Sequence, residues 1–211
     1  MTLQIQAFTL GPIQNNTYLI YDDETKHALV VDPALEPAPL AEFINQHSLI
    51  LLKVLITHAH FDHYYGLPFL QNSFPTLKDI YLHPDDLDLW RAGGSARQFF
   101  GKNLDIAEPN QIFTTMDDIF LDDHVFQIRS VPGHTAGSVL FYSNELKSAF
   151  CGDAIFYHGI GRTDLPGGDF DTLIQSIRNQ VFTLPDETRL FPGHGPATTV
   201  IEEKENNPFL H

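Results

Sequence analysis

The chain has 211 residues, of which 43% are hydrophobic and 18% are charged, a composition typical of an ordinary globular protein. Twelve Lys and Arg residues against 27 Asp and Glu residues give a net charge of −15, which argues against a nucleic-acid partner because such binding depends on basic side chains that neutralise phosphates. A single cysteine excludes an internal disulfide, no stretch approaches the length of a membrane span, and the N-terminus lacks the features of a signal peptide, so we expect a cytoplasmic protein with no membrane partner.

The predicted strands and helices alternate along the chain. Alternating or continuous apolar residues predict strands over 3–9, 17–21, 28–31, 51–56, 80–82, 125–131, 139–142, 149–151 and 189–191. Helical spacing predicts helices over 37–47 and about 66–72, and two more that begin at 84 and near 169. The helix from 169 has an apolar stripe of Phe170, Leu173, Ile174, Ile177 and Val181. No linker divides these elements, so we predict one domain over residues 1–211.

Residues 57–63, Thr-His-Ala-His-Phe-Asp-His, directly follow the predicted strand over 51–56. Three imidazoles and a carboxylate so close together cannot all point inward as packing groups. In an extended segment, alternation would aim His58, His60 and Asp62 to one side and turn His63 away from them. Zinc, iron and manganese accept neutral imidazole and carboxylate ligands, so this segment predicts a metal centre in preference to a solvated loop.

Three further candidate ligands lie in turns that follow predicted strands. His134 and His194 each stand in a Pro-Gly-His turn, and Asp153 follows Gly152. Each residue alone would be an ordinary turn residue, since turns favour Asp and glycine. Five of the eleven histidines fall in these motifs, however, and their concentration predicts a metal centre whose ligands are His58, His60, Asp62, His63, His134, Asp153 and His194.

Four motifs of the chain resemble those of the metallo-β-lactamase superfamily: residues 57–63, Gly-His-Thr-Ala-Gly-Ser at 133–138, Gly-Asp at 152–153 and Pro-Gly-His-Gly at 192–195. Within this superfamily, residues 161–169 and 202–210 are similar to the glyoxalase II (hydroxyacylglutathione hydrolase) branch, especially its short single-domain bacterial members. The resemblance implies an α/β fold, a four-layer αββα sandwich in which two mixed β-sheets pack face to face and helices cover both outer faces.

The family pattern also implies roles for the candidate ligands. It implies that His58, His60 and His134 bind one metal ion. It implies that a second metal ion is bound by Asp62, His63 and His194, that Asp153 bridges the two ions, and that Asp62 and Asp153 are the catalytic residues. The expected cofactors are two divalent cations, zinc in the first place, with iron or manganese as alternatives.

The reaction that this resemblance implies is hydrolysis of a thioester such as S-lactoylglutathione. Two dications that share a water would lower its pKa towards ~7, so that a bridging hydroxide could attack the carbonyl carbon. The expected partner is therefore a small-molecule thioester. Seventeen residues follow His194, so we expect no C-terminal helical domain of the kind that helps two-domain glyoxalase II enzymes to hold glutathione.

Three residues near the motifs are candidates for substrate binding. The planar fork of Arg162 suits a substrate carboxylate, although it could instead pair with Asp164 or Asp169. Tyr65, where the family commonly has glycine, could wall the pocket or pack under the loop. Tyr157 could line the pocket or pack within a turn.

Two other activities of the same fold remain as alternatives. A persulfide dioxygenase with one iron would share all of these motifs but use only part of the ligand set, and a lactonase would be a hydrolase with a different substrate. Counting bound metal ions and measuring oxygen consumption would separate the dioxygenase from a hydrolase.

Overall fold

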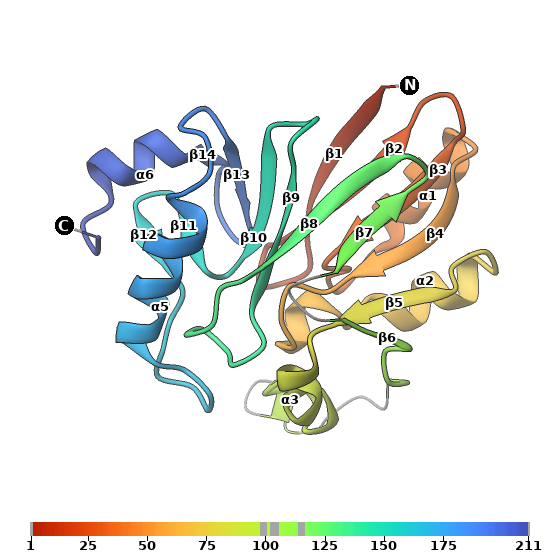
Figure 1. Ribbon diagram of the computed structural model, residues 1–211. Helices are drawn as coiled ribbons and strands as arrows, with labels where there is room; N and C mark the ends of the chain where they lie inside the picture. The colour runs from red at the N-terminus through yellow and green to blue at the C-terminus, as the bar shows by residue number, and fades with distance from the viewer. Residues whose placement is uncertain (1, 98–100, 102–105, 114–116, 211) are drawn as a thin grey trace.

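The computed structural model describes residues 2–97, 101, 106–113 and 117–210. Within these residues, two six-stranded sheets pack face to face (Figure 1). The first sheet begins as an antiparallel meander of three strands and continues with parallel neighbours. Its strands, in spatial order, are β1 (Leu3–Leu10), β2 (Asn15–Asp22), β3 (His27–Val31), β4 (Ile50–Leu55), β5 (Asp79–Leu82) and β6 (Gln111–Ile112).

The second sheet is also mixed, since β10 and β13 are parallel whereas its other neighbours are antiparallel. In spatial order it contains β14 (Thr198–Thr199), β13 (Arg189–Pro192), β10 (Ser148–Gly152), β9 (Val139–Ser143), β8 (His124–Ser130) and β7 (Asp118–Leu121). A separate two-stranded hairpin consists of β11 (Ile155–Phe156) and β12 (Gly159–Ile160).

Helices cover the outer face of each sheet (Figure 1). On the first sheet these are α1 (Ala38–Gln46) and α2 (Leu67–Ser73), and on the second sheet α5 (Phe170–Ser176), a π-helical turn (Ile177–Val181) and α6 (Val200–Asn206). Two 3₁₀ turns, Phe61–His63 and Pro84–Asp86, and the short helix α3 (Leu87–Arg91) lie in the connections. The buried apolar side chains form three clusters, one between the sheets and one beneath each helical layer. The predicted αββα fold is therefore confirmed.

The apolar runs of the sequence reflect strands that are buried on both faces. On β2, Tyr18 and Ile20 point towards the second sheet, whereas Leu19 points towards the helices, as the two-residue period of a strand requires. Every residue of β10 is buried for the same reason. Strands of this kind appear in a sequence as continuous apolar segments, and this explains why their positions were predicted correctly.

Some predicted details are wrong and some elements were missed. Phe170 is 48% exposed and does not belong to the apolar stripe of its helix, and that helix changes to π-helical geometry at Ile177. The sequence analysis did not predict β6, β7, β11, β12, β14 or α6. Four of these strands have two residues each, too few for any periodicity, and α6 buries only Val200 and Glu203.

Among the described residues, no helix combines the length and the apolar character that crossing a membrane requires. The prediction of a single domain stays a prediction.

Candidate metal centre

The candidate ligands gather at one edge of the two sheets because the strands that precede them end there. The segment 58–63 follows β4, His134 follows β8, Asp153 follows β10 and His194 follows β13. Strands β8, β10 and β13 run in the same direction, so their carboxyl ends lie at the same edge of the second sheet. This arrangement brings together residues that are 136 positions apart in the numbering, His58 and His194.

Three histidines form a first group. His134 Nε2 lies 3.2 Å from His58 Nε2 and 2.9 Å from His60 Nδ1. One nitrogen from each of the three side chains lies within 4.8 Å of the other two, close enough for all three to hold one metal ion.

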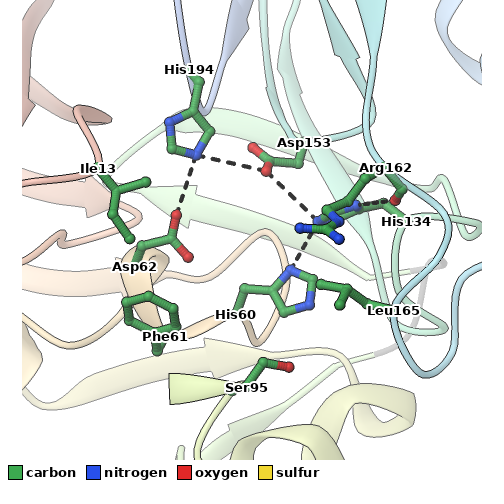
Figure 2. A pocket seen from close by; sticks show the side chains of 11 residues that line it. Ile13, His60, Phe61, Asp62, Ser95, His134, Asp153, Arg162, Leu165 and His194 are labelled. Carbon is green, nitrogen blue, oxygen red and sulfur yellow. Dashed lines mark hydrogen bonds and ion pairs between the residues drawn. The ribbon is translucent and has the colours of Figure 1, made fainter. Parts of the chain in front are cut away.

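A second group contains Asp62, His63 and His194, and Asp153 lies between the groups. Asp62 Oδ2 is 3.2 Å from His194 Nε2 and 3.8 Å from His63 Nε2. Asp153 Oδ1 is 3.4 Å from His63 Nε2, and Asp153 Oδ2 is 3.7 Å from both His134 Nε2 and His194 Nε2. Figure 2 shows the Asp153 carboxylate between His194 and His134. One carboxylate thus reaches both groups.

The prediction that His63 turns away from the other ligands is wrong. Residues 61–63 form a 3₁₀ turn instead of an extended segment, so side-chain alternation stops at His60. The turn brings His63 back over His58, with 4.0 Å between the two ring centres. All seven candidate ligands therefore converge.

Outer hydrogen bonds orient three of the imidazoles. His134 Nδ1 donates to the Arg162 carbonyl at 2.7 Å, and His63 Nδ1 donates to Asp32 Oδ2 at 2.9 Å. His58 Nδ1 lies 3.1 Å from Thr57 Oγ1, whose own proton is donated to Asp32. When each of these rings is neutral with its proton on Nδ1, its Nε2 presents a lone pair to the centre, as in metal-ligating histidines.

The inner atoms of the cluster need a cation. His63 Nε2 and Asp153 Oδ1 are buried and have no hydrogen-bond partner among the described residues. Buried polar atoms without partners are costly. Nitrogen and carboxylate-oxygen lone pairs that face one another at these distances repel, and a divalent cation between them removes the repulsion. The residues therefore fit a metal-binding cluster of histidine and aspartate.

The electrostatics of the cluster also suit metal binding. Burial, together with the neighbouring His134, lowers the pKa of His60 to about 3, and burial lowers the pKa of His58 well below its ordinary value. Burial opposes ionisation of Asp153 as well, but His63 and other histidines outweigh it and hold the pKa of this carboxyl low. Ligands must be deprotonated to bind a metal, and His58, His60 and Asp153 meet this condition at neutral pH.

A cavity of about 170 Å³ opens above the cluster. Its walls include His60, Asp62, His134, Asp153 and His194 from the cluster, together with Ile13, Phe61, Gly94, Ser95, Arg162 and Leu165 (Figure 2). The apolar residues Ile13 and Leu165 were missed in the sequence, where no feature distinguishes them from core residues.

The three substrate-binding candidates lie in different places relative to the cavity. Arg162 lines the cavity, and its Nε and Nη2 also donate to the two carboxylate oxygens of Asp164, each at 2.7 Å. Tyr65 does not line the cavity: it is buried in the core under the first sheet, and its hydroxyl donates to the Gly93 carbonyl. Tyr157 is an exposed residue of the β11–β12 turn, stacked on His158. Of the two alternatives for each tyrosine, the structure therefore agrees with packing and not with a place in the pocket wall.

Two buried carboxylates around the cluster were also missed. Asp32 binds His63 and both the backbone N–H and the hydroxyl of Thr57, and Asp86 binds Ala59, Thr135 and Gly137. Asp32 directly follows the predicted strand over 28–31, so the strand-end signal that identified Asp153 could have identified it. Asp86 has no comparable signal.

Comparison with known proteins agrees with this geometry. The hydroxyacylglutathione hydrolase GloC of Haemophilus influenzae is 38% identical over 212 residues, which cover 99% of both chains. The persulfide dioxygenase ETHE1 of Homo sapiens is 33% identical over 92% of this chain and 70% of its own length.

Solved structures have the same fold. The BLEG-1 B3 metallo-beta-lactamase superposes with a TM-score of 0.92 at 34% identity, covering 98% of this chain and 99% of the other. TTHA1623, solved in a di-iron-bound form, superposes with a TM-score of 0.86 at 37% identity, covering 97% of this chain and 100% of the other. Residues 10–194 match the family described as the Metallo-beta-lactamase superfamily. The chain belongs to the metallo-beta-lactamase superfamily.

Proposed function

We propose that this protein is a dinuclear metal-dependent hydrolase that cleaves a small thioester such as S-lactoylglutathione. The observation that carries the proposal is the position of Asp153, whose carboxylate lies between the His58–His60–His134 group and the Asp62–His63–His194 group. Asp153 would bridge the ions that these groups hold. The similarity to a hydroxyacylglutathione hydrolase over the full chain supports the substrate class.

Bound metal ions would supply Lewis-acid polarisation of the acyl carbonyl and activation of water at neutral pH. Asp62 and Asp153 both line the cavity, and His63 helps to hold the pKa of each carboxyl low against the effect of burial. As ionised groups they can accept a hydrogen bond from the attacking water and orient it towards the acyl carbon. A thiol has a pKa near ~8.5, so the leaving thiolate needs no residue that protonates it.

The cavity walls suit a short acyl group. Ile13, Phe61 and Leu165 offer an apolar surface, and Arg162 offers a guanidinium beside it. A guanidinium binds carboxylate or hydroxyl oxygens, so Arg162 would orient the polar end of the acyl chain or of the thiol.

The test combines metal analysis with hydrolysis of a panel of thioesters, lactones and a β-lactam. We expect two equivalents of zinc, iron or manganese and the highest kcat/KM on a thioester. If the protein preferred a lactone or a β-lactam, the assigned substrate would change but the protein would still be a hydrolase. Absence of hydrolysis by the fully metallated protein would contradict the proposal.

The second candidate is a persulfide dioxygenase with a single iron, favoured by the 33% identity to the human enzyme. It predicts one equivalent of ferrous iron and oxygen consumption with glutathione persulfide. A thioesterase would instead bind two metal ions and consume no oxygen. Measuring the metal content and the oxygen consumption of one preparation therefore separates the two functions.

We further propose that the protein is cytoplasmic and that its partner is a small molecule, without nucleic acid or membrane. Cell fractionation tests the first point, and retention on immobilised DNA or on anionic vesicles would contradict the second.

A further inference from the structure

Asp86 lies outside the four motifs, yet its carboxylate is buried and accepts three hydrogen bonds. Asp86 Oδ2 accepts from the Ala59 N–H at 2.7 Å and from the Thr135 hydroxyl at 2.8 Å, and Asp86 Oδ1 accepts from the Gly137 N–H at 2.7 Å. The residue is only 1% exposed. A carboxylate is costly to bury unless hydrogen bonds compensate for lost water, and here three donors surround it.

The donors belong to the two loops that carry the first ligand group. Ala59 stands between His58 and His60, and Thr135 follows His134. The loops are far apart in sequence, with 74 positions between His60 and His134. Gly137 fits directly against Asp86, because a Cβ at this position would lie 2.7 Å from the Asp86 backbone nitrogen and 2.8 Å from its Cβ. Asp86 thus joins two loops whose flanks are also linked by a backbone hydrogen bond, from the Val139 N–H to the Thr57 carbonyl at 2.9 Å.

We propose that Asp86 is a positioning residue for the first ligand group. By holding the Ala59 N–H, the Gly137 N–H and the Thr135 hydroxyl together, it sets the separation of His58 and His60 from His134, and so the affinity of this group for its metal ion. The inference rests on the metal centre of the proposed function. Asp32 bonds to His63 of the second group and to Thr57, which contacts His58 of the first group, whereas the donors to Asp86 all lie in the two loops of the first group.

Asparagine cannot replace Asp86 in this role. The two backbone groups that face its oxygens, Ala59 N–H and Gly137 N–H, are donors only. An amide oriented to accept from one of them would point its own NH₂ at the other, so Asp86→Asn breaks the link between the loops while keeping the size of the side chain. The matched control is Asp88→Asn, the same chemical change two residues away, at a side chain that is 97% exposed.

The experiment is a zinc titration of the full chain against a chromophoric chelator. For Asp86→Asn we expect one of the two zinc equivalents to weaken by about 10- to 100-fold, the usual effect of losing a partner that orients metal ligands. The other equivalent and both equivalents of Asp88→Asn should keep their wild-type affinity. Wild-type affinity for both equivalents in Asp86→Asn would overturn the proposal.

Double variants identify the affected site. Combined with His134→Ala, Asp86→Asn should cause little further loss, because both changes act on the first group. Combined with His194→Ala, it should weaken the remaining equivalent by the same factor as in the single variant. The reverse pattern would assign Asp86 to the second group and contradict the inference.

A second variant covers the case in which Asp86→Asn fails to fold. Thr135→Val removes one donor to Asp86, and Thr135→Ser, its control, keeps the hydroxyl that donates. We expect Thr135→Val alone to weaken one zinc equivalent, and equal affinities in the two variants would overturn the proposal. Because zinc affinity is measured without substrate, a wild-type protein that binds zinc as expected but hydrolyses no thioester would refute the proposed function and leave this inference standing.

Discussion

Glycine residues determine how closely the candidate ligands approach one another. A Cβ on Gly193 would collide with Asp153 Oδ1 and with His63 Cε1, so an alanine side chain would push two ligands apart. We expect Gly193→Ala to lower metal affinity and hydrolysis by about 10- to 100-fold while the far-UV circular dichroism stays that of the folded protein.

The control for this variant is Gly159→Ala in β12. A Cβ there meets nothing nearer than 3.6 Å, which is ordinary van der Waals contact. It should keep both metal equivalents and full turnover. If Gly193→Ala also kept them, the close approach of Gly193 to Asp153 and His63 would have no functional role.

Arg162 tests the polar side of the cavity. Its guanidinium lines the cavity and is held by Asp164. Hydrogen bonds between charged groups contribute about 1.5–3 kcal/mol, so Arg162→Ala should raise KM by about tenfold or more for a thioester that carries a carboxylate, with kcat nearly unchanged. Asp164→Asn keeps the charge of Arg162 but loosens its position, and should raise KM by less. If the wild type, Arg162→Ala and Asp164→Asn each had the same KM for charged and for uncharged thioesters, Arg162 would not bind a substrate carboxylate.

The seven candidate ligands could be predicted because each has a local signal, a histidine-rich segment or a turn after an apolar strand. The residues of the cavity walls have no such signal. Closeness in sequence to a ligand did not identify residues that line the cavity. Tyr65 is two residues from His63, yet the turn over Phe61–His63 sends it into the core, where its hydroxyl binds the Gly93 carbonyl. The places of Tyr65 and of the cavity-wall residues depend on the backbone geometry of turns, which the sequence patterns do not specify.

At the scale of the elements, a buried histidine joins the two sheets at the edge opposite the metal centre. His124, at the start of β8, contacts Asp22 Oδ2 at 2.9 Å through Nε2 and Glu145 Oε2 at 2.7 Å through Nδ1. Asp22 ends β2, and Glu145 lies between β9 and β10. Because both nitrogens face carboxylates, the doubly protonated ring satisfies both contacts. Burial lowers the pKa of His124, but these two carboxylates outweigh burial and raise it above its ordinary value.

This contact predicts a pH dependence of stability. A raised histidine pKa stabilises the fold fully below the unfolded value of ~6.5, and the contribution is lost as the pH rises through the folded value. The hydrogen bond to His124 lowers the pKa of Asp22 to about 2, so that contribution is present above ~4 and lost only as the pH falls through the folded value. His124→Gln should therefore reduce the free energy of unfolding by about 2 kcal/mol at pH 5.5 and by clearly less at pH 9, as measured by urea denaturation. A difference that grew with pH would contradict this assignment.

Strands were predicted better than helices because their burial on two faces leaves continuous apolar segments. Helix α6 has one buried apolar residue, Val200, and its buried Glu203 instead accepts hydrogen bonds from Thr198 and Asn207. A helix that is held in place by hydrogen bonds has no periodic pattern of apolar residues in its sequence. The change to a π-helical turn after Ser176 is likewise invisible in the sequence, since Leu173, Ile177 and Val181 keep ordinary helical spacing.

At the scale of the whole molecule, the metal centre is a junction between the sheets. The segment 58–63 comes from the first sheet, whereas His134, Asp153 and His194 come from the second. The pairing of the sheets could be predicted only through the resemblance of the four motifs to a known family, because apolar periodicity identifies strands but not the order in which they pair. Bound metal ions would therefore connect the two halves of the sandwich.

Removal of metal should consequently destabilise the whole protein. A ligand that binds only the folded state at about 1,000 times its Kd adds about 4 kcal/mol of stability. For chains of this size 1 kcal/mol corresponds to about 2–4 °C in Tm, so thorough chelation should lower Tm by about 10 °C, and added zinc should restore it. Asp153→Asn, which alters the carboxylate shared by both groups, should show a smaller response to chelator, whereas Asp88→Asn should respond like the wild type. A chelated wild-type protein with unchanged Tm and full turnover would show that the seven side chains do not function as a metal centre.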